Sequence, residues 1–465
     1  MEKRYCVCIN FGNETTTASY LNLTATYPLN KDGFLDVPQL NILNGNTDET
    51  RKIKTAIYRS YDGQWELATE RECFTKKGIA IHFINKIERV SLEDKEHYTA
   101  FIRLVFQAII ANNSFLYFDN NNPENRNFDL YICSSGWSKY DTNDYNTVIE
   151  DYKKFFSTVL PMPVTLISRE DAISFSFRSF NYQKRSLLIE INAATIDSIY
   201  DSPIEGKTIF SGTCNGVGHI ARDIQNWCAE TQETYKKAKS VIPIVLEETD
   251  NKNINWEMPV RHYIEEMVEH FYYHNCSRLL LDLPCVLVLG DILGNKVEEY
   301  DCQDILYHCN IREEVLNEIL ANYRLMLKND FNKLHDSGIM PEVIILVNNV
   351  FPVPWIKELI KDIFKGIQII SRHGSHIVSD GIALYAYSNH RLQTTIKSKF
   401  TEIINREFSG TMQEFLLESC NNFIDKDITV PAFEKYENNN ARINASLIKN
   451  MYLVNIPRKA SNELK

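Results

Sequence analysis

Residues 187–201, LLIEINAATIDSIYD, read as a strand, a tight polar turn and a second strand. Residues 8–20, CINFGNETTTASY, show the same pattern: an Ile-Asn pair enters a Thr-containing turn that leaves toward Ser and Tyr. The two stretches lie about 180 residues apart along the chain. Because repetition at a fixed offset indicates a duplicated architecture, we expect two related halves, each opening with a hairpin.

Strand and helix patterns alternate outward from both hairpins, which is typical of an α/β fold. Apolar residues at three- and four-residue spacing predict a helix over residues 93–111, and Asp62-Gly63 predicts a hairpin turn within 53–67. The other expected strands cover residues 4–10, 16–22, 130–134, 164–167, 207–211, 285–289, 296–300, 342–349 and 367–370. The other expected helices cover residues 147–160, 171–180, 354–364 and 396–408.

Length and composition limit the class of protein. The chain of 465 residues is long enough for about three domains, and its 44% hydrophobic and 24% charged residues are typical of a globular fold. Fifty Lys and Arg against 61 Asp and Glu give a net charge of −11, which disfavours nucleic acid as a partner. The first residues lack a signal-peptide pattern, and no apolar run is long enough to span a membrane. We therefore expect a cytoplasmic protein with no membrane partner.

Five short motifs follow one another along the chain: INFGNETTTAS at residues 9–19, EINAATID at 190–197, GTCNGVGHIARDI at 212–224, NNVFPVP at 348–354 and VSDGIALYA at 378–386. Their order and spacing resemble the nucleotide-binding part of heat-shock-70-like chaperones, within the actin and sugar-kinase superfamily. Residues 9–19 stand where that family carries Asp-x-Gly-Thr-Thr. Residues 190–197 match the family's second phosphate loop, Asp-x-Gly-Gly-Gly-Thr-x-Asp. Residues 212–224 match a following Gly-rich segment, residues 348–354 the adenosine loop, and VSDGIALYA at 378–386 the closing motif.

The resemblance implies an α/β protein with the duplicated ribonuclease H-like, two-lobed fold of actin-like ATPases. The implied units are lobe I (1–185) with a small inserted subdomain (about 36–115), lobe II (186–390) with an inserted helical subdomain (about 236–335) and the adenosine loop (346–355), and a C-terminal helical extension with a polar tail (391–465). The extension is too short for the peptide-binding domain of a chaperone.

The same resemblance implies a site for ATP and magnesium in the cleft between the lobes. Backbone N–H groups of both hairpin turns would lie against the phosphates, and carboxylates at the strand ends would hold the water shell of the metal. Glu190 and Asp197 are the implied catalytic carboxylates, and Lys86 is the implied phosphate-contacting lysine. The implied nucleotide-binding residues are Asn10, Gly12, Asn13, Glu14, Thr15, Thr16, Asn192, Ala193, Ala194, Thr195, Gly216, Gly218, Arg261, Glu266, Asn348 and Asn349. No side chain is expected to bind the metal directly.

The chain departs from the family's residues at each loop, and these departures weaken the expected site. Asn10 stands where the family carries Asp, so it brings no negative charge to a hydrated cation. Glu14 lies in the first phosphate turn, where a carboxylate about 4 Å from a phosphate oxygen would cost on the order of 1–4 kcal/mol. Ala193 and Ala194 replace glycines and lose backbone freedom, while Asn348 and its neighbour would crowd a base that glycine admits.

A histidine-rich helix offers a second candidate constellation. His262, Glu266, His270 and His274 recur every four residues and could ligate a metal. Two alternatives remain open: a helix that contacts the base through Arg261 and Glu266, and an ordinary half-buried aromatic helix.

We expect a protein that binds ATP with weak or no hydrolysis, and whose lobes close on the nucleotide to change a surface for a protein partner. One alternative is ordinary hydrolysis, with Glu190, Asp197 and magnesium assisting an attacking water. The other is complete loss of the nucleotide, which would leave a non-catalytic pseudo-ATPase interaction scaffold. A sugar-kinase-like activity is disfavoured, because no acidic base beside a sugar pocket is recognisable in the sequence.

Overall fold

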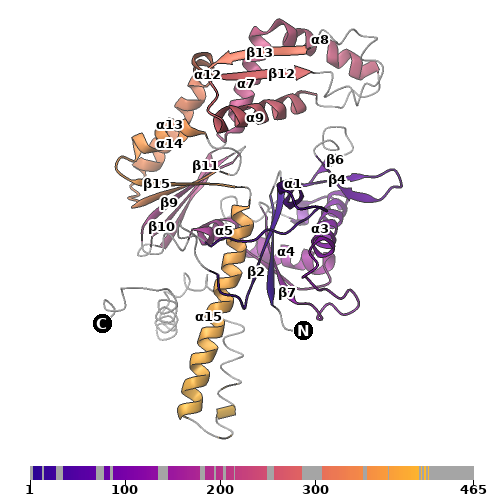
Figure 1. Ribbon diagram of the computed structural model, residues 1–465, viewed down its shortest axis with the longest axis vertical. Coiled ribbons are helices and arrows are strands. Elements are labelled where there is room, and N and C mark those ends of the chain that lie inside the picture. Colours follow the sequence, from indigo (N-terminus) through magenta and orange to yellow (C-terminus); the bar gives the residue numbers. More distant parts are fainter. Residues whose placement is uncertain are drawn as a thin grey trace.

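The computed structural model has a mixed α/β fold built on two five-stranded sheets (Figure 1). It describes residues 4–12, 15–27, 35–69, 78–83, 87–134, 145–177, 184–192, 195–202, 206–213, 215–248, 256–284, 306–348, 353–374 and 376–407, with 410, 413–414 and 417. Within this part of the chain, no helix is both long and apolar enough to cross a membrane.

The first sheet is formed by strands from the N-terminal half of the chain, in the order β3-β2-β1-β7-β8. Its strands are β1 (Tyr5–Phe11), β2 (Thr15–Asn22), β3 (Lys52–Lys54), β7 (Phe128–Ser134) and β8 (Val164–Leu166). β2 runs antiparallel to both β1 and β3, whereas β1, β7 and β8 are parallel to one another. The opening hairpin and the crossover strands therefore share one sheet.

The second sheet repeats this topology in the C-terminal half, in the order β11-β10-β9-β14-β15. Its strands are β9 (Ser186–Ile191), β10 (Ile196–Ser202), β11 (Gly206–Thr213), β14 (Val343–Asn348) and β15 (Gln368–His373). β10 is antiparallel to β9 and β11, and β9, β14 and β15 are parallel. Strand order and strand direction thus agree between the two halves.

The hairpin turns set the correspondence between the residues of the two halves. Gly12 N donates to Thr15 O over 3.1 Å, and Asn192 N donates to Thr195 O over 2.8 Å. Gly12 therefore corresponds to Asn192, and Asn10 corresponds to Glu190. Aligning the two Ile-Asn pairs with each other is therefore wrong by two residues, because the hydrogen bond that closes each turn, rather than the repeated dipeptide, decides which residues correspond.

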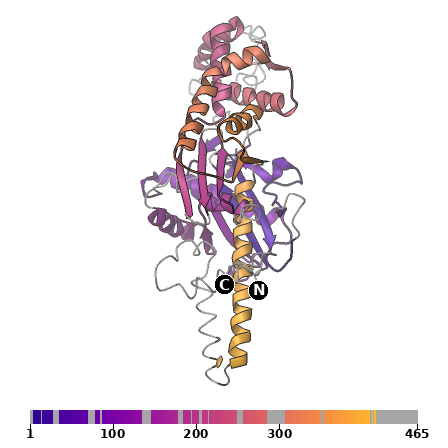
Figure 2. The ribbon, with the colours of Figure 1, turned by 90° about the vertical axis from the view of Figure 1, so that its left-hand side faces the viewer.

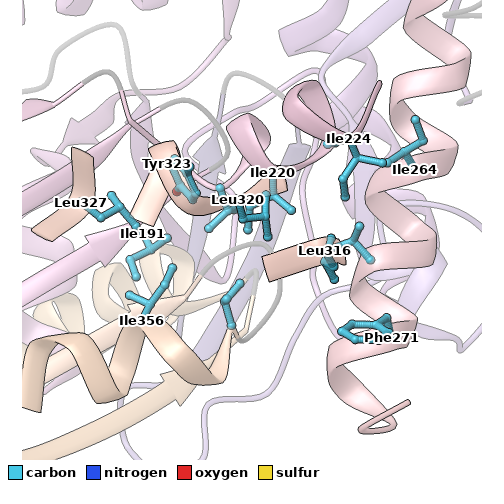
Figure 3. Close-up of a cluster of buried hydrophobic side chains, with 14 of the residues drawn as sticks. Ile191, Ile220, Ile224, Ile264, Phe271, Leu316, Leu320, Tyr323, Leu327 and Ile356 are labelled. Carbon is cyan, nitrogen blue, oxygen red and sulfur yellow. The ribbon is translucent and has the colours of Figure 1, made fainter. Parts of the chain in front are cut away.

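Buried side chains form three clusters, one outside each sheet and one between the sheets. Alternation along β1 sends Val7 and Ile9 to the outer cluster of the first half and Cys6 and Cys8 to the shared central cluster. The outer face of the first sheet is covered by α3 (Leu92–Asn112) and α4 (Tyr145–Val159). Figure 3 shows the outer cluster of the second half, where Ile191 packs with residues of the neighbouring helices.

Two helices cross between the sheets: α5 (Arg169–Ser176) and α15 (Ile377–Glu407). Each follows the last parallel strand of its own sheet. At their crossing, a Cβ atom built on Gly381 would lie 1.8 Å from the carbonyl oxygen of Ala172, so the position accepts only glycine without a shift of the backbone. Beyond the crossing, α15 continues well past both sheets (Figures 1 and 2).

The remaining elements surround this frame. A small sheet contains β4 (Ala56–Arg59), β5 (Trp65–Leu67) and β6 (Gly78–Ala80), with α1 (Asp48–Arg51) and the 3-10 helix η1 (Ile87–Arg89) nearby in the sequence. The second half carries α7 (Gly218–Thr231), α8 (Glu233–Glu248), α9 (Glu257–Tyr273), β12 (Arg278–Pro284), β13 (Leu306–Arg312), α12 (Glu313–Ile319), α13 (Ala321–Asp336) and α14 (Pro354–Ile363). Of these, α7, α8, α9, β12 and β13 lie at the end of the molecule opposite the projecting end of α15 (Figure 1).

Two expected boundaries separate residues that the structure joins. The range 36–115, expected as an inserted subdomain, contains β3 and α3, yet β3 pairs with β2 and α3 packs on the first sheet. The expected boundary at 390/391 falls inside α15, which continues because nothing in the sequence there stops a helix. The strands expected at 285–289 and 296–300 lie outside the described residues.

Candidate functional site

The candidate site lies where the central strands of both sheets end and face the shared core. In the first sheet, Asn10 on β1 pairs with Thr17 on β2, and in the second, Glu190 on β9 pairs with Asp197 on β10. These pairs correspond through the register of the two hairpin turns, and strand alternation places all four side chains on the inner face. An amide and a hydroxyl in one half thus correspond to two carboxylates in the other.

Arg169, the first residue of α5, binds both oxygens of Glu190 across the two halves. Its Nε donates to Glu190 Oε2 over 3.3 Å, and its Nη2 donates to Glu190 Oε1. The same Nη2 donates to Asn192 Oδ1 over 3.3 Å. A two-pronged contact of this kind is among the strongest that a guanidinium and a carboxylate form.

This ion pair is withdrawn from solvent. The Glu190 side chain is fully buried, and that of Arg169 is 15% exposed. Burial acts to lower the pKa of the Arg169 guanidinium, but Glu190, with smaller contributions from Cys133 and Asp197, raises that pKa overall. Arg169 therefore stays charged, and the Glu190 carboxylate has a charged partner where an isolated carboxylate would be costly.

Asp197 is held by its own hairpin turn. Its Oδ2 accepts hydrogen bonds from Thr195 Oγ1 over 2.9 Å and from Asn192 Nδ2 over 3.2 Å. The carbonyl of Asn192 accepts a bond from Val217 N over 3.0 Å, just before α7 begins. The Asn192 side chain thereby joins Asp197 on one side to Arg169 on the other.

The corresponding strand positions in the first half, Asn10 and Thr17, carry no charge. Asn10 is 5% exposed, and its Oδ1 has no hydrogen-bond partner among the described residues. A Cβ atom on Gly12 would lie 2.6 Å from Thr15 O, so this turn requires glycine. Thr16 is fully buried and its Oγ1 shares a 2.9 Å hydrogen bond with the Thr55 hydroxyl, so it is used in packing.

The other expected site residues fall into three groups. Gly216 and Gly218 lie at the start of α7, and Asn348 ends β14 directly beside Ile191, so these residues neighbour the second turn. Arg261 Nε donates to the buried Gln225 Oε1 over 3.0 Å, which directs Arg261 toward α7, and Glu266 is exposed on α9. Asn13, Glu14, Lys86, Ala193, Ala194 and Asn349 lie outside the described residues.

A second polar network joins β2 to the first turn of α15. Ser19 Oγ donates to Asp380 Oδ1 over 2.7 Å and shares a 2.8 Å hydrogen bond with the Ser379 hydroxyl. Thr17 Oγ1 donates to Ser379 Oγ over 3.3 Å. The network links opposite ends of the described chain, and it is not predictable from the sequence because Ser and Thr in a strand carry no signal for such a partner.

Arg169 was also missed, although one local signal lies beside it. Ser168 caps the N-terminus of α5: its Oγ accepts from Asp171 N over 3.1 Å and donates to Asp171 Oδ2 over 2.6 Å. This spacing predicts a helix that starts at Arg169, slightly before the expected start. The partner of Arg169 lies in the other half of the chain, on another sheet, and leaves no local pattern.

The histidine-rich helix is α9. The rings of His270 and His274 lie 4.4 Å apart, while the His262 side chain is not described. Among the described residues, no group of three or more His, Cys, Asp and Glu side chains is arranged to hold a metal ion.

A hydrated magnesium ion does not fit the second turn as it stands. Magnesium is bound through one or two carboxylates, and here both oxygens of Glu190 are held by Arg169 while Asp197 Oδ2 is held by two neighbours. A fixed guanidinium charge at the same oxygens also repels a divalent cation.

Neither a family model nor a curated protein sequence matches this chain.

Proposed function

We propose that this chain is a heat-shock-70-like, actin-like protein that has become a non-hydrolysing interaction scaffold. Support for the fold is the repeated topology: each half opens with a hairpin, and its parallel strands end beside a shared core. A duplicated ribonuclease H-like, two-lobed architecture has this strand order in both lobes.

The observation that carries the functional proposal is the contact between Arg169 and Glu190. The carboxylate that would orient the water shell of magnesium is fully buried and bound on both oxygens by a guanidinium from the other lobe. Since phosphoryl transfer depends on metal and charge placement, a second turn closed in this way disfavours hydrolysis. The function that remains is to present a surface to a protein partner.

The direct test measures ATP binding by calorimetry and phosphate release with millimolar ATP and magnesium. We expect no saturable heat, no phosphate release above a buffer blank, and a melting temperature that Mg-ATP leaves unchanged. Asp197→Ala serves as the control, since it removes a carboxylate that would contribute to turnover. Phosphate release by the unmodified chain that this variant abolishes would refute the proposal.

A second candidate function is metal-independent binding of a nucleotide. One feature favours it: the start of α7, where no side chain caps the helix N-terminus and the first backbone N–H groups are available to an anion. A calorimetric titration with ATP in the presence of a chelator distinguishes the two functions. The scaffold predicts no binding, whereas this alternative predicts binding that magnesium does not improve.

A further inference from the structure

Three oxygen acceptors from the second half converge on one cation from the first. Arg169 contacts both carboxylate oxygens of Glu190 and the amide oxygen of Asn192. Asp197, which pairs with Glu190 in the strand register, acts on the same guanidinium through its charge. Carboxylate and amide oxygens in such an arrangement are ligands that hard divalent cations use in proteins.

The two charges depend on each other. Glu190 has no exposed surface, so removing Arg169 would leave a buried carboxylate without this partner. A buried charge stripped of its partner is strongly destabilising, and a group in that position takes up a proton or another cation. The interlobe face therefore needs a positive charge at this point.

Arg169 projects from a rigid support. The hydrogen bonds between Ser168 and Asp171 fix the first turn of α5, and the contact between Ala172 and Gly381 holds the same turn against α15. α5 lies between the two sheets (Figure 1). The guanidinium is thus held in place without any ligand.

We propose that Arg169 is a resident cation that joins the two halves at Glu190 and Asn192, in the position where a bound metal ion would otherwise be needed. This inference rests on the proposed function, because it explains how the lobes stay together without magnesium or nucleotide. The arrangement of the lobes is therefore built into the chain and does not respond to a ligand.

The test compares the melting temperatures of the full chain, Arg169→Ala, and the double variant Arg169→Ala with Glu190→Gln. Each is measured with increasing millimolar magnesium or calcium chloride, and with sodium chloride at matched ionic strength. We expect R169A to melt on the order of 10 °C below the unmodified chain. Divalent cations should restore part of that loss in R169A alone, because only this variant combines a vacant site with the carboxyl group of Glu190.

Two results would overturn the proposal. One is an R169A variant whose melting temperature responds to divalent cations no more than that of the unmodified chain. The other is an equal response in the double variant, which would place the added cation elsewhere. Both results are independent of ATP binding by the unmodified chain, so failure here is distinguishable from failure of the scaffold function.

Arg169→Lys provides a second measurement if R169A does not fold. Lysine keeps the charge but gives up the two-pronged contact, so we expect R169K to fold, to melt between R169A and the unmodified chain, and to show no response to divalent cations. Arg169→Gln is the neutral counterpart and should melt lower than R169K. If R169K is no more stable than R169Q, the charge is not what joins the halves and the inference is wrong.

Discussion

A Cβ atom on Gly381 would lie 1.8 Å from the carbonyl oxygen of Ala172, so the backbones of α15 and α5 meet directly where the helices cross. The hydroxyl of Ser176, one turn further along α5, donates to Ile377 O over 2.6 Å and reinforces the same crossing. Because each helix follows the last strand of a different sheet, this contact sets the spacing between the two halves.

Gly381→Ala should destabilise the protein by about 3 kcal/mol or more, at the upper end of the usual cost of overpacking a core. The obstacle here is a backbone carbonyl that cannot rotate away. Urea denaturation followed by circular dichroism measures the free energy of unfolding. Ser398→Ala, at an exposed position of the same helix, is the control and should be neutral. A G381A variant as stable as this control would mean that the helices separate at little cost.

Ser19→Ala should lower the free energy of unfolding by about 1–3 kcal/mol, because it removes a buried donor to the Asp380 carboxylate. The same substitution breaks the hydroxyl contact between Ser19 and Ser379. Ser157→Ala removes an exposed hydroxyl that bonds only to its own helix and should change stability by less than about 0.5 kcal/mol. Equal changes in the free energy of unfolding for the two substitutions would show that the buried network does not stabilise the protein.

The buried thiol of Cys133 makes the free energy of unfolding depend on pH in the alkaline range. Burial raises the pKa of its thiol above the ordinary value of 9.0, and the opposing charge of Arg169 only reduces this effect. The folded state therefore keeps the proton while the unfolded state loses it above about pH 9, so this contribution is complete below pH 9 and falls as pH rises.

Cys133→Ala isolates that contribution. Above about pH 9, the unmodified chain should lose stability more steeply than the variant, by up to about 1.4 kcal/mol per pH unit. Buried groups such as Tyr131, whose pKa burial also raises, affect both proteins equally. Parallel curves of unfolding free energy against pH would contradict the assignment.

Trp355→Phe should destabilise the second half by about 1–2 kcal/mol, because phenylalanine loses a hydrogen-bond donor and weakens a cation–π contact. Trp355 Nε1 donates to Tyr272 Oη over 3.0 Å, and the Arg324 guanidinium lies 4.6 Å from the centre of the indole ring. Burial raises the pKa of Tyr272, so its hydroxyl stays protonated and neutral at physiological pH. Urea denaturation measures the loss.

Trp65→Phe is the matched control for this substitution. Trp65 also lies beside a guanidinium, that of Arg59 at 4.8 Å, so it reports the cation–π part of the change. The loss of free energy in W355F beyond that in W65F measures the hydrogen bond to Tyr272. A loss of free energy in W355F no greater than that in W65F would show that the hydrogen bond to Tyr272 adds no measurable stability.

Much of the architecture is predictable from local sequence patterns. The hairpins at the start of each half have alternating strand residues and small polar turns, and both appear in the structure as β1–β2 and β9–β10. The hairpin expected within residues 53–67 is present as β4 and β5, but its expected first strand also included most of β3, which pairs with β2 in another sheet. The place of β3 in the first sheet is set by its partner β2.

The candidate site was predictable only in its position. Glu190, Asp197 and Asn192 do lie together, because the register of one hairpin brings them side by side. Their engagement with Arg169 could not be read from the sequence, since it depends on how α5 packs between the sheets. The same holds for Ser19 and Asp380, which come from opposite ends of the described chain.

The continuity of α15 has a mechanical consequence. The helix crosses α5 at Gly381 and runs unbroken to Glu407, roughly 39 Å further at the rise of an α-helix. Its far end stands clear of both sheets (Figure 2). Because the helix has no break between these two points, a displacement of its far end would be transmitted to the crossing with α5, where the two halves meet.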